Sequence, residues 1–279
     1  MNRSSPLAHS PRTFAALAAL ACTALLAQGC DDYPSTGAGN VPDHIEQVVM
    51  ASDRSAADRQ RDAERKPAQI LTFARVSGAS QVLELGAGAG YTTELLARIL
   101  ALGAEGQVDR PGVDNPVVDG PVVYAQNTRE VLEKYVKGAF DERMKNPHMA
   151  IVRPVVRSYE NPVPEGVTEL DAVLAVFVYH DLVADGLDRA GMNRALFEAM
   201  ESGAVYTVID HAGNPEFPEQ RNGQLHRVAE EQVIREVEAA GFKLVERGDF
   251  LRYPDDPRDQ AFFEREQPVD QFALRFVKP

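Results

Sequence analysis

Short β-rich runs alternate with amphipathic segments of helix length along most of this chain, and this alternation limits the fold more than any other feature. Seven runs are predicted to be strands, at residues 81–85, 122–126, 150–156, 172–178, 204–209, 243–250 and 271–277. Strands that alternate with helices form mostly parallel sheets covered on both faces. The last two runs have no helix-length segment between them, so we expect them to pair antiparallel. The pattern predicts an α/β fold with a mostly parallel, seven-stranded sheet and an antiparallel C-terminal strand.

The segments between the strands have helical spacing of apolar residues. Apolar side chains share one face in each of three predicted helices, at residues 92–102, 189–200 and 230–240. Gly103 and Gly241 follow the first and third of these, as is typical of helix ends. A Pro-, Gly- and Asp-rich stretch at residues 109–121 is expected to be a surface insertion.

A helical cap is expected before the first strand, at residues 43–76. Its segment 55–74 mixes arginines with acidic residues, and Pro67 is suited to open a second helix there. Two interpretations stay open. The segment is either a solvated, ion-paired helix or a lid over an active site, whose arginines meet an anionic group.

The first thirty residues have the layout of a bacterial export signal. Arg3 and Arg12 precede the apolar stretch 14–27, and Gly29 stands directly before Cys30. This end resembles a lipobox, after which the cysteine is lipidated, although Ala27 occupies the position where leucine is usual. We therefore expect a lipoprotein-type signal at 1–29, a tether at 30–42 and the folded domain at 43–279. The implied location is periplasmic, with a lipid anchor at Cys30; free secretion and an uncleaved anchor are the alternatives.

Charge and cysteine content exclude several classes of protein. The chain has 29 Lys and Arg against 42 Asp and Glu, a net charge of −13, so a nucleic-acid partner is not expected. Only Cys22 and Cys30 are present, which excludes a disulfide scaffold or a cysteine-based zinc site. If Cys30 is lipidated, no thiol remains for catalysis.

The most informative motif is VLELGAGAGYTT at residues 82–93, a strand that runs through a glycine-rich turn into a helix. Gly86, Gly88 and Gly90 allow close approach of a ligand, and the start of the helix favours a negatively charged group. A dinucleotide fingerprint would need glycine at position 91, where the chain has Tyr91. The alternative for this motif is a glycine turn that only packs.

These residues resemble motif I of the class I S-adenosylmethionine-dependent methyltransferases, a glycine turn preceded by an acid. The resemblance implies S-adenosylmethionine as cofactor, bound by Glu84, Gly86, Gly88, Gly90 and Tyr91. Further segments, including VFVYHD at 176–181 and VIDHAG at 208–213, are similar to a group of predicted exported bacterial methyltransferases. The resemblance extends from about residue 53 to the C-terminus.

The chain departs from the family at two positions that the resemblance assigns to the cofactor. An acid commonly ends the second strand and binds the ribose hydroxyls, whereas this chain has Gln126 and Asn127, with Glu130 the nearest acid. Amide oxygens accept weaker hydrogen bonds than carboxylates. Glu160 is the candidate for the adenine contact, with an exposed loop acid as the alternative.

Candidate catalytic residues follow the fourth and fifth predicted strands, whose carboxyl ends face the ligand crevice in such sheets. Tyr179, His180 and Asp181 form one group, in which His180 is the expected base and Asp181 orients it. His211 follows the next strand beside Asp210, and His226 starts a later segment. Hydrogen-bonded structural histidines are the alternative.

Two histidines and two aspartates at these strand ends have side chains that divalent metals bind: His180, Asp181, Asp210 and His211. We predict none, because adjacent residues on a strand point apart.

The resulting hypothesis is a transferase that moves a methyl group from S-adenosylmethionine to an unidentified small acceptor. The alternative is a non-catalytic module that keeps the fold and binds S-adenosylmethionine or another nucleoside. A nicotinamide-dependent oxidoreductase is disfavoured by Tyr91.

Overall fold

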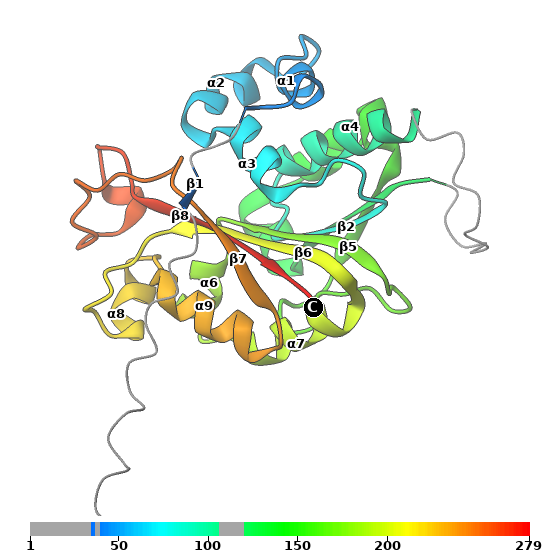
Figure 1. Cartoon of the computed structure of the whole chain (residues 1–279). Coiled ribbons are helices and arrows are strands. Elements are labelled where there is room, and N and C mark those ends of the chain that lie inside the picture. The colour runs from blue at the N-terminus through cyan, green and yellow to red at the C-terminus, as the bar shows by residue number, and fades with distance from the viewer. Residues whose placement is uncertain (1–34, 37–39, 106–119) are drawn as a thin grey trace, which may run out of the picture. The chain divides into compact units, whose positions relative to one another are not determined.

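The computed structural model describes residues 35–36, 40–105 and 120–279. Eight strands form one sheet in the order β1-β7-β8-β6-β5-β2-β3-β4. The strands are β1 (Ser35–Thr36), β2 (Gln81–Leu85), β3 (Val122–Asn127), β4 (Val152–Val156), β5 (Leu170–Val176), β6 (Met200–His211), β7 (Lys243–Gly248) and β8 (Gln271–Val277). All neighbouring strands are parallel except β8, which is antiparallel to both β6 and β7. The seven expected strands, β2 to β8, form the mostly parallel sheet that was predicted, and the two-residue β1 adds a further strand at its edge (Figure 1).

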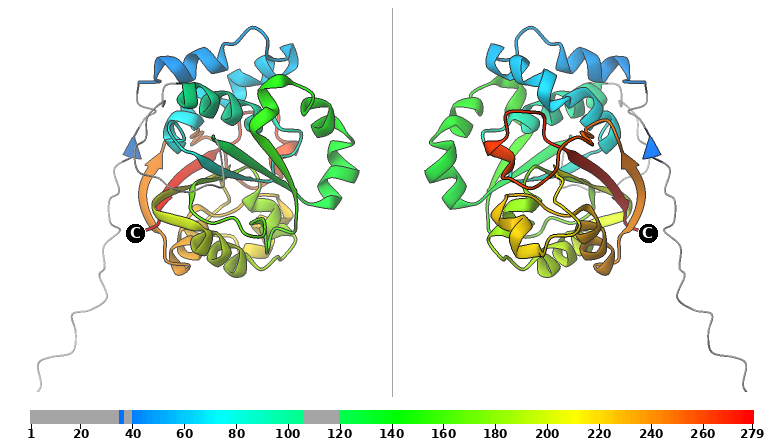
Figure 2. Two further views of the ribbon diagram at one scale, coloured as in Figure 1. Left: turned by 90° about the vertical axis from the view of Figure 1, so that its right-hand side faces the viewer. Right: turned by 90° about the vertical axis from the view of Figure 1, so that its left-hand side faces the viewer.

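The helices cover both faces of this sheet. They are α1 (Asp43–Val49), α2 (Ala56–Arg65), α3 (Pro67–Ala74), α4 (Tyr91–Glu105), α5 (Ala139–Arg143), α6 (Tyr179–Ala184), α7 (Arg189–Ala199), α8 (Glu219–Gln224) and α9 (Glu230–Ala239). One buried cluster joins α6, α7 and α9 to the sheet, and a second joins α1, α3 and α4 to its other face. Figures 1 and 2 show these two layers on either side of the strands. None of the helices in the described part of the chain is long and apolar enough to cross a bilayer.

The sheet brings three strand ends together at one edge. Leu85 of β2 is in register with Ala175 of β5, and Val176 of β5 with Ile209 of β6. Because these strands are parallel, their carboxyl ends open on the same side. The glycine turn, the start of α6 and the end of β6 therefore surround one region.

The N-terminal cap folds as three helices, α1 to α3, and the second and third of these meet at Pro67. Ser55 caps α2 by accepting a hydrogen bond from the Asp58 N–H at 3.0 Å, and Pro67 occupies the first turn of α3. Lys66 between these two has a φ of 48°, a left-handed conformation that ends α2. The break expected at Pro67 is confirmed.

Some boundaries differ from the expectation. β6 begins at Met200 rather than at residue 204, because strand pairing with β5 extends past the apolar run. A π-helix at Val131–Val136 fills an interval that was not assigned. A 3₁₀-helix at Pro147–Ile151 includes the first two residues of the strand expected at 150–156, so β4 begins at Val152. A further 3₁₀-helix lies at Phe262–Glu264.

Part of the expected tether joins the sheet edge. Ser35 and Thr36 pair in parallel with Arg247 and Gly248 of β7. The proposed signal segment and residues 109–119 of the expected insertion lie outside the described residues, so export and lipidation at Cys30 stay predictions.

Candidate active site

The glycine turn between β2 and α4 has free space beside its central glycine, Gly88. Gly86, Gly88 and Gly90 all have positive φ, at 64°, 56° and 83°. A Cβ on Gly86 would lie 2.6 Å from Val178 Cγ2, and one on Gly90 would lie 2.8 Å from Arg143 Cδ. A Cβ on Gly88 would meet no atom nearer than 4.0 Å. Packing therefore requires the outer two glycines, whereas Gly88 borders open space.

Two amides at the end of β3 hold this turn in place. Gln126 accepts a hydrogen bond from the Gly86 N–H at 3.1 Å and donates one to the Arg157 carbonyl at 2.7 Å. Asn127 accepts one from the Gly88 N–H at 2.8 Å and donates one to the Gly88 carbonyl at 3.1 Å. Both side chains are buried. The residues expected to meet ribose hydroxyls are instead bonded to the glycine turn and its surroundings.

Glu84 lies inside the sheet, one residue before the end of β2. It is 3% exposed and accepts a hydrogen bond from Thr93 Oγ1 at 2.5 Å. Burial raises the pKa of Glu84 to about 7, although the hydrogen bond from Thr93 and the charges of Arg143 and Arg65 act in the opposite direction. A cation bound nearby would favour the ionised form of this carboxyl.

A pocket lies between the N-terminal cap and the start of α4. Its volume is about 250 Å³ with the open mouth included, and its lining includes Arg65, Tyr91, Thr92 and Phe177. The Arg65 guanidinium lies 5.0 Å from the Tyr91 ring centroid and 5.7 Å from that of Phe177. Among the ion pairs of the described residues, none includes Arg65. The pocket therefore presents a guanidinium that makes no ion pair within the described residues. The same cap also contains ion pairs, of Arg54 with Asp62 and of Asp58 with Arg143, so features of both interpretations are present.

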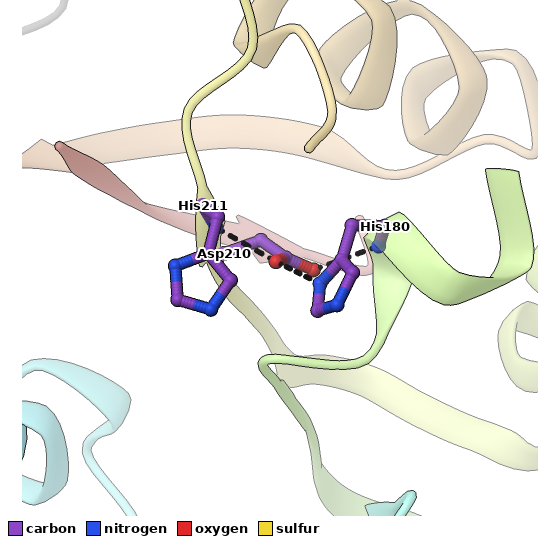
Figure 3. Close-up of side chains that lie close together, drawn as sticks. All are labelled: His180, Asp210 and His211. Atoms are coloured by element: carbon purple, nitrogen blue, oxygen red, sulfur yellow. Dashed lines mark hydrogen bonds and ion pairs between the residues drawn. The ribbon is translucent and has the colours of Figure 1, made fainter. Parts of the chain in front are cut away.

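The imidazoles of His180 and His211 lie at the carboxyl ends of neighbouring strands, with the Asp210 carboxylate between them (Figure 3). His180 Nδ1 is 2.6 Å from Asp210 Oδ1. The same carboxylate accepts hydrogen bonds from the His180 N–H at 3.0 Å and the His211 N–H at 2.7 Å. The residue that orients His180 through Nδ1 is thus Asp210. Asp181, which was expected in that role, lies instead 3.2 Å from Nε2.

The two imidazoles have opposite protonation preferences. Burial disfavours the charged form of His180, but Asp210 and Asp181 raise its pKa to about 10. Burial lowers the pKa of His211 to about 3, and its Nδ1 atom has no hydrogen-bond partner. At neutral pH His180 holds a proton and His211 is neutral. His211 is therefore the neutral imidazole of this pair, with an unpartnered Nδ1 that can accept a hydrogen bond but is a weak base.

Two candidate residues are not brought into this group. Tyr179 is fully buried, and its hydroxyl lies 2.7 Å from Glu236 and 3.0 Å from Asn193, on the side of α9 and α7. Glu160 is exposed in the turn after β4. In this arrangement Tyr179 serves the packing of the helices, and no hydrogen bond or ion pair within the described residues joins Glu160 to the glycine turn or the imidazoles.

Further side chains complete the site, and of these only Phe262 comes from a segment that the sequence did not connect to it. His226, after α8, places Nδ1 2.9 Å from Asp181 Oδ1. Phe262 stacks on His211 with a centroid distance of 3.8 Å, and Phe177 lies 5.0 Å from the same ring at a similarly small angle. Local patterns gave no signal for Phe262, because it lies in a polar stretch far along the chain.

The argument against a metal from strand alternation does not hold in the structure. Ligand atoms of His180, Asp210 and His211 lie within 4.8 Å of one another, as do those of His180, Asp181 and His226. His180 and His226 approach from outside β6, so alternation along that strand does not separate the groups.

No protein-family model matches the sequence, and no curated protein is detectably similar to it. Solved structures do resemble the fold. A SAM-dependent methyltransferase from Aquifex aeolicus is 16% identical, with a TM-score of 0.53 over 84% of this chain and 98% of that one. The [4+2]-cyclase SpnF is 14% identical, with a TM-score of 0.53 over 82% of this chain and 85% of that one. The glycopeptide N-methyltransferase MtfA is 18% identical, with a TM-score of 0.50 over 81% of this chain and 100% of that one. The strand order and these similarities show that the chain has the Rossmann-like fold of class I methyltransferases.

Proposed function

We propose that this protein binds S-adenosylmethionine at the glycine turn and transfers its methyl group to a small acceptor beside the imidazoles. The observation that carries the proposal is the open space at Gly88, at the carboxyl edge of the sheet. The pocket beside the N-terminal cap lies at the start of α4, the helix that follows this turn, and is lined by Arg65, which makes no ion pair within the described residues. The fold agrees, although SpnF shows that a cyclase also uses it.

The residues fit the amino-acid half of this cofactor. Arg65 and the N-terminus of α4 suit its carboxylate, and Glu84, when ionised, suits its ammonium group. The ribose half has weaker support, because Gln126 and Asn127 already bond to backbone groups. We therefore assign these two amides to holding the turn rather than to accepting ribose hydroxyls.

The bound cofactor supplies an electrophilic methyl group, so the protein has to align the acceptor and, for a hydroxyl, remove its proton. His211 is neutral and lies between two aromatic rings at the end of β6. His180 directs Nδ1 at Asp210 and Nε2 at Asp181, so both of its ring nitrogens face carboxylates. The unpartnered Nδ1 of His211 supports a role in positioning an acceptor through a hydrogen bond rather than as a strong base, because its pKa is low.

The first test is calorimetric titration of the purified chain with S-adenosylmethionine, and separately with S-adenosylhomocysteine. Gly88→Val should abolish binding, because the new side chain fills the space that the turn leaves open. Gly186→Val is the matched control. Gly186 has a φ of 63°, close to the 56° of Gly88, and a Cβ there would also meet nothing within 4 Å. Both variants bear the same backbone strain, but only one changes the turn.

We expect micromolar binding by the native chain and by Gly186→Val. No binding of either compound at millimolar concentration would overturn the proposal. Equal affinity of Gly88→Val and the native chain would move the site away from this turn.

A further inference from the structure

The imidazoles of His180 and His226 both lie close to the carboxylate of Asp181. His180 Nε2 lies 3.2 Å from Asp181 Oδ1, and His226 Nδ1 lies 2.9 Å from the same oxygen. The side chains of Asp181 and His226 are 46% and 40% exposed, so solvent reaches the group. One carboxylate oxygen thus faces two nitrogen atoms that belong to different segments of the chain.

The His180 ring is oriented from behind by a buried carboxylate. Asp210 is fully buried and holds His180 Nδ1 at 2.6 Å, which leaves Nε2 directed at Asp181. Asp210 also accepts two backbone N–H groups, so its position is fixed independently of the ring. A carboxylate behind a histidine in this way is the usual second partner of a metal-binding imidazole.

His226 is held at the site by its backbone. It has a φ of 47°, a left-handed conformation that costs free energy in a residue other than glycine. Its N–H donates to the Gly223 carbonyl at 2.9 Å, and the next residue, Arg227, is fully buried in an ion pair with Asp256. The segment is therefore anchored on both sides of the imidazole.

The spacing of the three groups suits a transition-metal ion. Bonds of about 2.0–2.2 Å to a tetrahedral ion place neighbouring ligand atoms about 3.4 Å apart. The two nitrogen-to-oxygen distances here, 3.2 and 2.9 Å, need to open by only a few tenths of an ångström. The two nitrogen atoms lie within 4.8 Å of each other, so they have to approach by no more than about 1.4 Å. Two imidazoles with one carboxylate form a set that first-row transition metals bind.

The neighbouring group of His180, Asp210 and His211 is less suitable. All three residues are buried, and the Asp210 carboxylate is already committed to three hydrogen bonds. An ion there would have to displace these bonds without access to water.

We propose that His180 Nε2, Asp181 and His226 Nδ1 form a binding site for a divalent first-row transition-metal ion, with Asp210 as the positioning residue behind His180. The ion takes the place of the hydrogen bonds that now join the two imidazoles to Asp181. Its binding displaces the Nε2 proton of His180 to solvent, and His226 binds through Nδ1 in the tautomer that carries its proton on Nε2. Water or an acceptor atom completes its coordination on the exposed side. This site does not depend on S-adenosylmethionine binding.

The test uses the full chain without an affinity tag, treated with a chelator and then dialysed. Zinc binding is measured by calorimetry, and Co²⁺ serves as a spectroscopic probe. We expect one ion per chain and a cobalt spectrum without the charge-transfer band of a thiolate, which excludes Cys22 and Cys30 as ligands. Asp181→Asn and His226→Asn should each weaken zinc binding at least tenfold. Asparagine tolerates the left-handed backbone at position 226.

His148→Gln is the matched control, because His148 also contacts a carboxylate, Asp53, at 2.9 Å and is also exposed. It should bind zinc like the native chain. Circular dichroism verifies that each variant is folded. Absence of zinc binding at 1 mM, native affinity in both ligand variants, or a cobalt–thiolate band would each overturn the proposal. Since binding is measured without S-adenosylmethionine, such a failure leaves the methyltransferase proposal standing.

Discussion

At the end of β3, neighbouring amide side chains act as internal supports for a turn that local sequence makes flexible. Asn127 bonds to both the N–H and the carbonyl of Gly88, the glycine that borders open space. A glycine with positive φ gains this conformation at little steric cost but loses much chain entropy on folding. The amide offsets part of that loss by fixing the peptide groups on both sides of Gly88.

Asn127→Ala should lower the free energy of unfolding by about 1–3 kcal/mol, because two half-buried backbone groups of Gly88 lose their partner. It should also raise the dissociation constant for S-adenosylmethionine about tenfold, equivalent to about 1.4 kcal/mol. Asn222→Ala is the control: Asn222 is also buried and bonds the N–H and carbonyl of Asn214 at 3.0 and 2.9 Å. Urea unfolding and calorimetry should show similar destabilisation in both variants but weaker binding only in Asn127→Ala. Equal affinities would show that the turn does not need this support.

At the scale of elements, one arginine joins the N-terminal cap to the glycine turn. Arg143 of α5 lies 2.7 Å from Asp58 of α2 and 2.6 Å from Glu94 of α4, and donates to the Ala89 carbonyl at 2.7 Å. Asp58 and Glu94 are both nearly inaccessible to solvent. Arg98 continues the network from Glu94 to Asp53. The cap is thus attached through buried charges as well as through its apolar side chains.

Arg143→Met should destabilise the protein by about 3–5 kcal/mol, because it leaves the buried Asp58 without its ion-pair partner and removes one of the two arginines that pair with Glu94. Hydrogen exchange should increase most in α2, where Asp58 loses its contact. Lys145→Met, two residues away, breaks a pair with Glu142 in which both side chains are more than 70% exposed. That change should leave the free energy of unfolding nearly unchanged, because solvent screens an exposed pair. If the two variants behave alike, the network does not hold the cap.

At the scale of the whole molecule, the stability of the fold depends on pH through Glu84, an ionisable side chain in the middle of the sheet. β2 has neighbours on both sides, β5 and β3, and Glu84 lies within it with its pKa raised by burial to about 7. In the unfolded chain the value returns to about 4.5. Between these values the unfolded state loses its proton first, so the free energy of unfolding falls as the pH rises from 4.5 through 7. Below pH 4.5 the carboxyl is protonated in both states and this loss is absent.

Glu84→Gln removes that dependence, since an amide stays neutral at every pH and still accepts the hydrogen bond from Thr93. At pH 8 the variant should exceed the native chain in stability by up to about 3 kcal/mol. At pH 4.5 the two should be similar. Urea unfolding of both proteins at each pH measures the difference in their free energies of unfolding. If this difference is the same at pH 4.5 and pH 8, the pKa of Glu84 is not raised.

Prediction from sequence succeeded where the signal was local. The bounds of β2 and β8 are those expected, because each is a short apolar run between turn residues. The glycine turn and the placement of His180 and His211 at strand ends follow from the order of the motifs along the chain. The start of β6 was less predictable, because residues 201–203 are not apolar and belong to the strand only through its pairing with β5.

The partners of the site residues were decided by tertiary structure. Asp181 is next to His180 in sequence, yet Asp210, thirty residues away, holds Nδ1. His226 meets Asp181 from a distance of 45 residues, and Phe262 covers His211 from another segment.

The sequence by itself determined the alternation of strands and helices, the positive-φ glycines and the residue types at the strand ends, because these depend on neighbouring residues. Only the folded sheet decided which carboxylate contacts which imidazole, that the amides of Gln126 and Asn127 serve the turn, and that Arg65 faces a pocket. Those contacts join segments far apart in the chain, and their geometry exists only after the strands have paired in register.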